Sequence, residues 1–399
     1  MTSPTLSCVA CGETTSEWTP ARCDCGEPRW VDVDGAEFDW DNVTDAPGMW
    51  RYESLLPVDR PGSLGDVAGD TPLVRTPRLD DVAGACIHVK NEAANATGSF
   101  KDRGSAVGIA WALEHGVDTV GTVSHGNMAM SMAAHAASVD LDCVVLVPAD
   151  IPAERLGNIA QYGPTLLRVD GDYGRLYDRS LELGEEAGIE FVNSDAPLRV
   201  EGQKTTALEI CEAFASEGAQ PPDAIVLPVS SGGHASGAWK AVRELHRAGA
   251  IDSLPRLYFV QAAACAPIAE AFERGDDEVT PVTAGETIAY SIANANPPSG
   301  NRVLAAARET GGGVLAVDDD AIRTAQREFA ARAGLSVETS SATTLAGTKR
   351  LAESGIIEDD DEVVLVATGS GFKERGSAET PDVETVKLDE LGSVFGVER

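Results

Sequence analysis

Apolar runs and stretches of helical periodicity alternate along the chain after about residue 80. Nine short runs are mainly apolar, which is typical of strands buried on both faces of a parallel sheet. Most are separated by Ala-rich segments with helical spacing, such as residues 131–139 and 321–333. We expect strands at residues 86–90, 119–124, 143–147, 166–169, 190–193, 224–229, 257–261, 314–317 and 363–367. The alternation predicts an α/β protein with doubly wound parallel sheets.

The ends of the chain differ from this central pattern. Residues 1–30 carry four cysteines, and residues 31–80 form a lead-in punctuated by Pro and Gly. The sequence after Lys373 turns polar and acidic, and we expect it to be peripheral. At 399 residues the chain exceeds what one hydrophobic core usually serves, so more than one domain is expected.

The charge balance excludes some partners. There are 64 acidic and 31 basic residues, giving a net charge of −33, and the acids are spread along the whole chain. This favours a salt-adapted surface, as in a halophile, over a single acidic face for a basic partner. It also argues against nucleic-acid binding. No apolar run approaches the roughly 20 residues of a membrane span, and the first residues do not resemble a secretory signal, so we expect a cytoplasmic protein.

Lys101 is the strongest candidate for covalent chemistry. It lies in the loop NATGSFKDRG, residues 95–104, which follows an expected strand and opens a helix. Ligands of parallel sheets bind in such loops, beyond the carboxyl ends of the strands. A helix start and desolvation both favour the neutral amine that condenses with an aldehyde. A surface lysine is the alternative, but the chain has only seven lysines.

Three further loops carry small and polar residues in equivalent places. The segment SHGNM at 124–128 suits a carboxylate or a hydroxyl, although Gly-Asn is also an ordinary turn. The segment PVSSGGH at 228–234 offers successive amides for a small phosphate group, whereas a simple turn would not need so many small residues. Thr368, in ATGSG at 367–371, could bond a buried heteroatom or cap a helix.

Together these loops resemble the fold-type II pyridoxal-phosphate enzymes of the tryptophan synthase β group, and among them the threonine synthases. The segment GSFKDRG at 98–104 is similar to the lysine motif of that family at every position. Asn193-Ser194, followed by RVEGQKT at 199–205, is similar to a second signature, and the segments at 50–57 and 71–74 to its opening region. The likeness runs from about residue 50 to residue 373.

The resemblance implies an architecture. It implies two doubly wound parallel-sheet domains of the tryptophan synthase β type, preceded by a small zinc-ribbon-like module, and a homodimer. The expected parts are a cysteine module at 1–30, a larger cofactor-binding domain at 31–110 and 190–375, a smaller domain at 111–189 and an acidic tail at 376–399.

The resemblance also implies roles for individual residues. Lys101 would bind pyridoxal phosphate as an imine and then move protons on the substrate. The other cofactor contacts implied are Asn127 at the phenolic oxygen, Thr368 at the ring nitrogen, and Ser230, Ser231, Gly232, Gly233 and His234 at the phosphate. The implied substrate contacts are Ser124, His125 and Arg155, with Asn193 and Arg199 at the substrate phosphate. His125 and His234 could each contact a ligand or simply fill the loop.

The reaction implied is the conversion of O-phospho-L-homoserine and water to L-threonine and phosphate. The chain departs from the family pattern at several pocket positions: SSGGH stands for GNAGN at 230–234, and Ser-His for Ser-Thr at 124–125. A dehydratase or a β-replacing, cysteate synthase-like enzyme acting on serine, threonine or O-phosphoserine is therefore an alternative. A catalytically silent relative that binds through its cysteine module is another.

The amino-terminal cysteines form two short pairs. Cys8 and Cys11 are spaced as CxxC, and Cys23 and Cys25 as CxC. Four thiolates would give Zn²⁺ a closed tetrahedral site, which predicts a structural rather than a catalytic metal. Disulfides are the alternative, and a cytoplasmic setting disfavours them.

Overall fold

All nine expected strands are present, and they divide between two sheets. The computed structural model describes residues 5–18, 22–33, 38–124, 126–149, 151, 153–171, 173–216, 218, 220–374 and 385–388. The larger sheet has the order β12-β11-β10-β13-β5-β4 and is parallel except for β4. Its strands are β4 (Leu73–Arg75), β5 (Cys86–Asn91), β10 (Ala224–Pro228), β11 (Arg256–Ala262), β12 (Gly313–Val317) and β13 (Glu362–Ala367).

The smaller sheet is parallel throughout and has the order β8-β7-β6-β9. Its strands are β6 (Thr119–Val123), β7 (Asp142–Pro148), β8 (Thr165–Val169) and β9 (Glu190–Phe191). β9 pairs with β6 in this sheet, whereas the expected domain boundary placed residues 190–193 with the larger domain. A third, antiparallel sheet of β1 (Thr5–Ser7), β2 (Thr14–Thr15) and β3 (Trp30–Asp32) forms the amino-terminal module.

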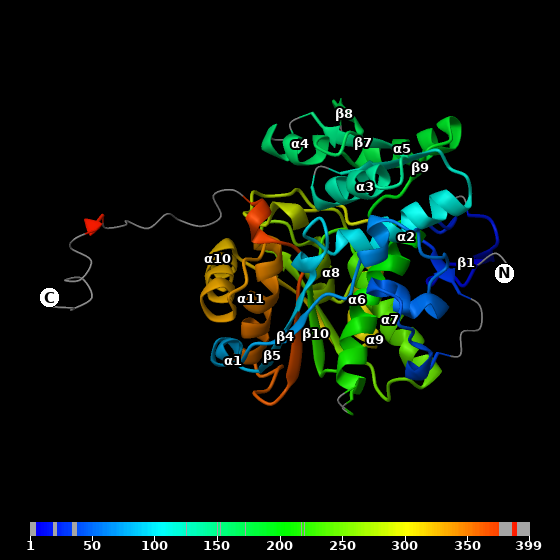
Figure 1. The fold of residues 1–399 in the computed structure, drawn as a ribbon. Helices are drawn as coiled ribbons and strands as arrows, with labels where there is room; N and C mark the ends of the chain where they lie inside the picture. Colours follow the sequence, from blue (N-terminus) through cyan, green and yellow to red (C-terminus); the bar gives the residue numbers. More distant parts are fainter. Residues whose placement is uncertain are drawn as a thin grey trace.

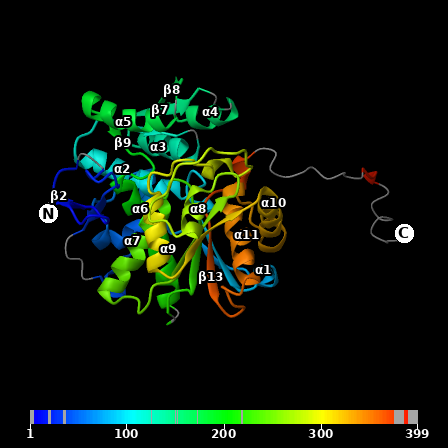
Figure 2. The ribbon, with the colours of Figure 1, turned by 180° about the vertical axis from the view of Figure 1, so that it is seen from behind.

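Helices cover both faces of the larger sheet (Figure 1). The helices are α1 (Pro77–Ala83), α2 (Lys101–Glu114), α3 (Asn127–Ala137), α4 (Ala153–Ala160), α5 (Tyr173–Ala187), α6 (Pro197–Ser216), α7 (Gly233–Ala248), α8 (Pro267–Arg274), α9 (Gly300–Glu309), α10 (Asp319–Glu328) and α11 (Thr339–Glu353). The smaller sheet, with α3, α4 and α5, lies at the top of both views (Figures 1 and 2). None of the described helices is both long enough and apolar enough to cross a membrane.

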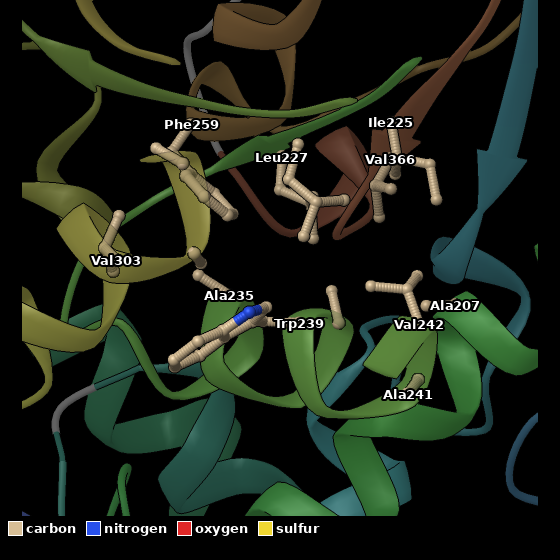
Figure 3. Packing of buried hydrophobic residues seen from close by; sticks show 14 of the residues in the cluster. Ala207, Ile225, Leu227, Ala235, Trp239, Ala241, Val242, Phe259, Val303 and Val366 are labelled. Atoms are coloured by element: carbon tan, nitrogen blue, oxygen red, sulfur yellow. The ribbon is translucent and has the colours of Figure 1, made fainter. Parts of the chain in front are cut away.

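Alternate residues of the central strands enter two separate cores, as the period of two in a strand requires. Ile225 and Leu227 of β10 pack with Trp239 and Val242 of α7 (Figure 3). Val226, between them in sequence, packs on the other face, in a core that α1, α10 and α11 also line. Both faces of the sheet are therefore buried, which explains why its strands correspond to continuous apolar runs in the sequence.

Three buried helices are stacked, with α6 between α2 and α7. A Cβ atom at Gly202 of α6 would lie 2.1 Å from the carbonyl oxygen of Arg103 in α2. Glycine therefore lets the two backbones touch. Gly237 of α7 approaches Lys204 of α6 in the same way, with 2.9 Å between a Cβ and the backbone nitrogen. This stacking fixes the start of α2, which carries Lys101, relative to the start of α7.

Candidate active site

Lys101 is the first residue of α2, and the loop before it is tied to the carboxyl end of β13. The amide of Phe100 donates to the carbonyl of Thr368 at 3.0 Å. The amide of Ser370 donates to the carbonyl of Gly98, also at 3.0 Å. Two expected loops, distant in sequence, are therefore neighbours at one edge of the sheet, as strands with a common direction require.

The environment of Lys101 favours the neutral amine. Protein atoms enclose its ammonium group, although the residue keeps some access to solvent. Desolvation lowers the pKa of Lys101 to about 7, with a further decrease from Arg199 and a partial offset from Glu338. The Nζ atom lies 4.4 Å from the centroid of the Phe100 ring. An amine with this pKa is available for condensation with an aldehyde at neutral pH.

The turn at residues 230–234 lies close to Lys101. The ring of Phe100 stacks on His234, with centroids 4.0 Å apart and planes at 10°. His234 is buried, and its Nε2 lies 3.1 Å from Thr206 Oγ1. Burial, with the nearby Lys101, holds the pKa of His234 well below its usual range, so its ring is neutral. His234 therefore supports Phe100 beneath the amine instead of adding positive charge.

The same turn forms a cradle of backbone amides. Gly232 adopts a φ of +90°, and no side chain caps α7, which begins at Gly233. The first-turn amides of a helix have no acceptor within the helix. A Cβ at Gly233 would lie 2.2 Å from the carbonyl oxygen of Ser194, so only glycine fits there. Ser299 lies against Gly232, and its buried hydroxyl has no partner among the described residues. Free amides beside a free hydroxyl fit a phosphate group.

Two further polar groups lie on segments that are bonded to the Lys101 loop, directly or through Lys373. Thr368 Oγ1 lies 2.9 Å from Ser341 Oγ, and both residues are buried. At the start of α3, Asn127 Nδ2 donates to both carboxylate oxygens of Glu338, at 2.8 and 3.0 Å. Asn127 Oδ1 accepts a hydrogen bond from Lys373 at 2.8 Å. An amine, an anion cradle, a hydroxyl pair and a carboxamide are what a phosphorylated pyridine aldehyde requires, so these residues fit pyridoxal phosphate.

Arg199 is a buried cation without an anionic partner. It lies in α6, fully buried, and its hydrogen bonds of 3.2 to 3.4 Å reach only neutral oxygens of Val192, Lys101 and Ser105. Within the described part of the chain, no carboxylate forms an ion pair with it. Desolvation lowers the pKa of Arg199 to about 9, with Asp102 offsetting part of the effect. Because a buried charge is costly without a counter-charge, this site favours an anion.

Both polar ends of the Asn193 side chain bond to neighbouring elements. It is fully buried, its Oδ1 accepts from the amide of Val123 at 2.9 Å, and its Nδ2 donates to Ser180 Oγ at 2.9 Å. These bonds join β6, β9 and α5, so the geometry gives Asn193 a structural part. Its contact with the substrate phosphate stays a prediction.

The other expected substrate contacts lie near the start of α3. Ser124 is buried, and its Oγ accepts from the amide of Gly126 at 3.3 Å. The guanidinium of Arg155 lies 4.5 Å above the Tyr290 ring, and its Nη1 is 3.9 Å from the position of a Cβ at Gly126. His125 lies outside the described residues.

The four amino-terminal cysteines converge. Their sulfur atoms all lie within 4.8 Å of one another. Cys8 Sγ is 3.5 Å from Cys25 Sγ, Cys11 Sγ is 3.4 Å from Cys23 Sγ, and all four are free thiols. Four sulfur donors in this arrangement fit a closed tetrahedral site for a thiophilic ion such as Zn²⁺.

The cysteine module contacts the loop that precedes α6. Arg22, beside the second cysteine pair, forms an ion pair with Asp195 at 2.5 Å. Tyr177 of α5 also donates to Asp195. From the same module, Trp30 donates to Ser236 Oγ in α7 at 2.8 Å. The module therefore packs against the elements that form the phosphate cradle.

Comparison with known proteins agrees with this geometry. Residues 64–369 match the family described as pyridoxal-phosphate dependent enzyme. A threonine synthase of Methanocaldococcus jannaschii is 37% identical, covering 96% of each chain. One of Mycobacterium tuberculosis is 35% identical over 86% of this chain and 93% of that protein.

Solved structures share the fold. The processed form of threonine deaminase isoform 2 from Solanum lycopersicum has a TM-score of 0.65 at 20% identity, covering 89% of this chain and 95% of its own. A maize serine racemase has a TM-score of 0.64 at 21% identity, covering 82% and 91%. The chain belongs to the pyridoxal-phosphate-dependent enzymes, and within them to the threonine synthase family.

Proposed function

We propose that the protein converts O-phospho-L-homoserine and water to L-threonine and phosphate. The single observation that indicates a phosphorylated substrate is the environment of Arg199. This buried guanidinium has no anionic partner among the described residues and lies next to Lys101. A guanidinium binds a phosphate through paired hydrogen bonds. The threonine synthase relatives cover nearly the whole chain, which supports the same substrate.

Pyridoxal phosphate, when bound, supplies an electron sink for negative charge that develops on the substrate carbon atoms. Lys101 would hold it covalently, and the cradle at residues 230–234, with Ser299, would hold its phosphate. Thr368 and Ser341 would face the ring nitrogen. A hydroxyl would not keep the ring nitrogen protonated as a carboxylate would. The electron sink would therefore be weaker than in enzymes that pair this nitrogen with an acidic side chain.

Different residues of the chain act on different parts of the substrate. The neutral amine of Lys101 takes the proton from the α carbon and serves again at the β carbon, which its pKa of about 7 permits. Arg199 binds the phosphate group and stabilises its negative charge as it leaves the γ carbon. Ser124 and the first amides of α3 bind the substrate carboxylate. Water adds at the β carbon, so that one phosphate leaves for each threonine formed.

Product analysis tests this proposal. Purified holoenzyme receives O-phosphohomoserine or O-phosphoserine, and phosphate and amino acids are measured for each. We expect equal amounts of phosphate and threonine from the first substrate. Phosphate release from O-phosphoserine alone would instead indicate a β-eliminating or β-replacing enzyme. Lys101→Ala should abolish turnover, whereas Lys349→Met, which removes a lysine whose side chain is 52% exposed, should not.

We also propose a structural zinc ion at Cys8, Cys11, Cys23 and Cys25. Four sulfur atoms within 4.8 Å support it, and the four thiolates would leave no open position for catalysis. Metal analysis of protein purified without chelator should give about one zinc per chain.

The remaining proposals concern organisation. The large excess of acidic residues supports a surface adapted to high salt. We propose two α/β domains, built around the six-stranded and four-stranded sheets, at approximately the expected boundaries. A homodimer and a cytoplasmic location complete the proposal, and light scattering of the purified protein would test the dimer.

A further inference from the structure

Lys373 is a second lysine of the active site, and the chemistry above does not use it. It ends the short helix η7 (Gly371–Lys373), which follows β13. Its Nζ lies 2.8 Å from Asn127 Oδ1, 3.4 Å from Glu338 Oε1 and 3.4 Å from the carbonyl oxygen of Thr97. Its side chain is 18% exposed and that of Glu338 only 6%, so the interaction is largely shielded from water. Three chain segments, distant in sequence, meet at this ammonium group.

The two partners of Asn127 determine which way its carboxamide faces. An ammonium group can only donate hydrogen bonds, and a carboxylate can only accept them. Lys373 therefore requires Oδ1 on its side, and Glu338 requires Nδ2 on the other. Rotating the amide by half a turn would bring oxygen against carboxylate and N–H against ammonium. The two oxygens of the Glu338 carboxylate lie in nearly the same direction from Nδ2, so one N–H is shared between them and the other remains available for a ligand.

Lys373 also balances the charge of Glu338. Glu338 precedes α11 and is buried beneath Gly369, where a Cβ would lie 2.4 Å from its Oε2. Among the described residues, Lys373 is the cation within ion-pair distance of this carboxylate. Glu338 favours the charged form of Lys101. A cation beside Glu338 acts against that influence.

We propose that Lys373 is a positioning residue, which holds the carboxamide of Asn127 so that an N–H faces the phenolic oxygen of the cofactor. This inference rests on the proposed use of pyridoxal phosphate and on the contact with its phenolic oxygen that the family resemblance implies for Asn127. An oxygen in place of that N–H would repel the phenolic oxygen. Lys373 thus acts through Asn127 on the cofactor and does not touch the substrate.

The test measures the cofactor band of the holoenzyme as a function of pH, together with kcat and KM. In Lys373→Met, the midpoint of the band's pH dependence should rise by about half a pH unit or more, because the phenolic oxygen loses a donor that stabilises its anion. We expect kcat to fall about tenfold, while KM changes less than about twofold. Lys373→Arg, which keeps a donor, should restore the midpoint. Lys349→Met is the matched control and should leave the midpoint unchanged.

A double variant shows whether Lys373 acts through Asn127. Asn127→Ala should shift the midpoint in the same direction, and combining it with Lys373→Met should add nothing further. Additive shifts would overturn the inference. So would an unchanged band with a raised KM, which would make Lys373 a substrate contact. If the Met variant does not fold, Lys373→Gln takes its place. It keeps an N–H that can face Asn127 Oδ1, so the midpoint and kcat should both stay close to the wild-type values, and an unchanged midpoint with a lowered kcat would overturn the inference. The band is read without substrate, so its result is separate from that of the product assay.

Discussion

The rate at which pyridoxal phosphate adds to the cofactor-free enzyme reports the protonation of Lys101. Only a neutral amine condenses with the aldehyde. The pKa of Lys101 falls from 10.5 to about 7. At pH 7 about half of these amines are therefore neutral, compared with about one in 3000 for an ordinary lysine. We expect the rate to rise about tenfold per pH unit below pH 7 and to level off above it.

Rapid mixing with visible absorbance detection, at pH values from about 5.5 to 9.5, measures this profile. Burial is the main cause of the low pKa, and Arg199 is the second. Arg199→Met should therefore move the plateau to higher pH, whereas Lys349→Met should not move it. A wild-type rate that still rises tenfold per unit up to pH 9 would refute the reasoning. A plateau unaffected by Arg199→Met would refute the part assigned to Arg199.

The same pKa shift links pH to stability. The folded cofactor-free protein holds Lys101 neutral above about pH 7, whereas the unfolded chain keeps this proton up to about pH 10.5. The unfolded state thus binds more protons in this window. The contribution of Lys101 to the free energy of unfolding should therefore increase as pH rises from 7 to 10.5 and be lost as pH falls towards 7. Urea unfolding of the wild type and Lys101→Met measures the difference.

Three further predictions concern the rest of the molecule. A strong chelator should lower the Tm by several degrees if the four-cysteine site holds zinc, and added zinc should restore it; an unchanged Tm in metal-containing protein would contradict a structural role. Arg22→Met, which leaves Asp195 buried with only the Tyr177 hydroxyl, should lower the free energy of unfolding by about 1 to 2 kcal/mol in urea. Arg179→Met, which removes only exposed ion pairs, should lower the free energy of unfolding by less than Arg22→Met does, and equal costs would contradict the reasoning. Raising KCl from about 0.1 M to about 2 M should raise the Tm, because salt screens the repulsion of a chain with net charge −33; a falling Tm would contradict a salt-adapted surface.

The fold was largely predictable because buried parallel strands leave a strong signal. All nine apolar runs correspond to strands of the two sheets. The additional strand of the larger sheet, β4, has only three residues and is mostly exposed, so no apolar run marks it. The expected domain boundary at 189/190 came from the family resemblance. It missed the pairing of β9 with β6, because no pattern in the neighbouring residues indicates which strand β9 pairs with.

The site was predictable where its residues lie together in sequence. The Lys101 loop and the 230–234 turn are contiguous motifs, and the structure brings them together through Phe100 and His234. Ser299 was not identified, because it becomes a ligand candidate only when a distant loop packs against the cradle. The sequence also could not show that Asn193 bonds β6 through its Oδ1 and α5 through its Nδ2, because these partners are distant in sequence.

The most direct test of the central claim is to locate the lysine that carries the cofactor. Borohydride reduction of the yellow holoenzyme fixes the cofactor to its amine, and peptide mass spectrometry then identifies the modified residue. We predict bleaching of the band and a label on Lys101 alone among the seven lysines. A label on Lys373 or on any other lysine, or no label at all, would contradict the assignment.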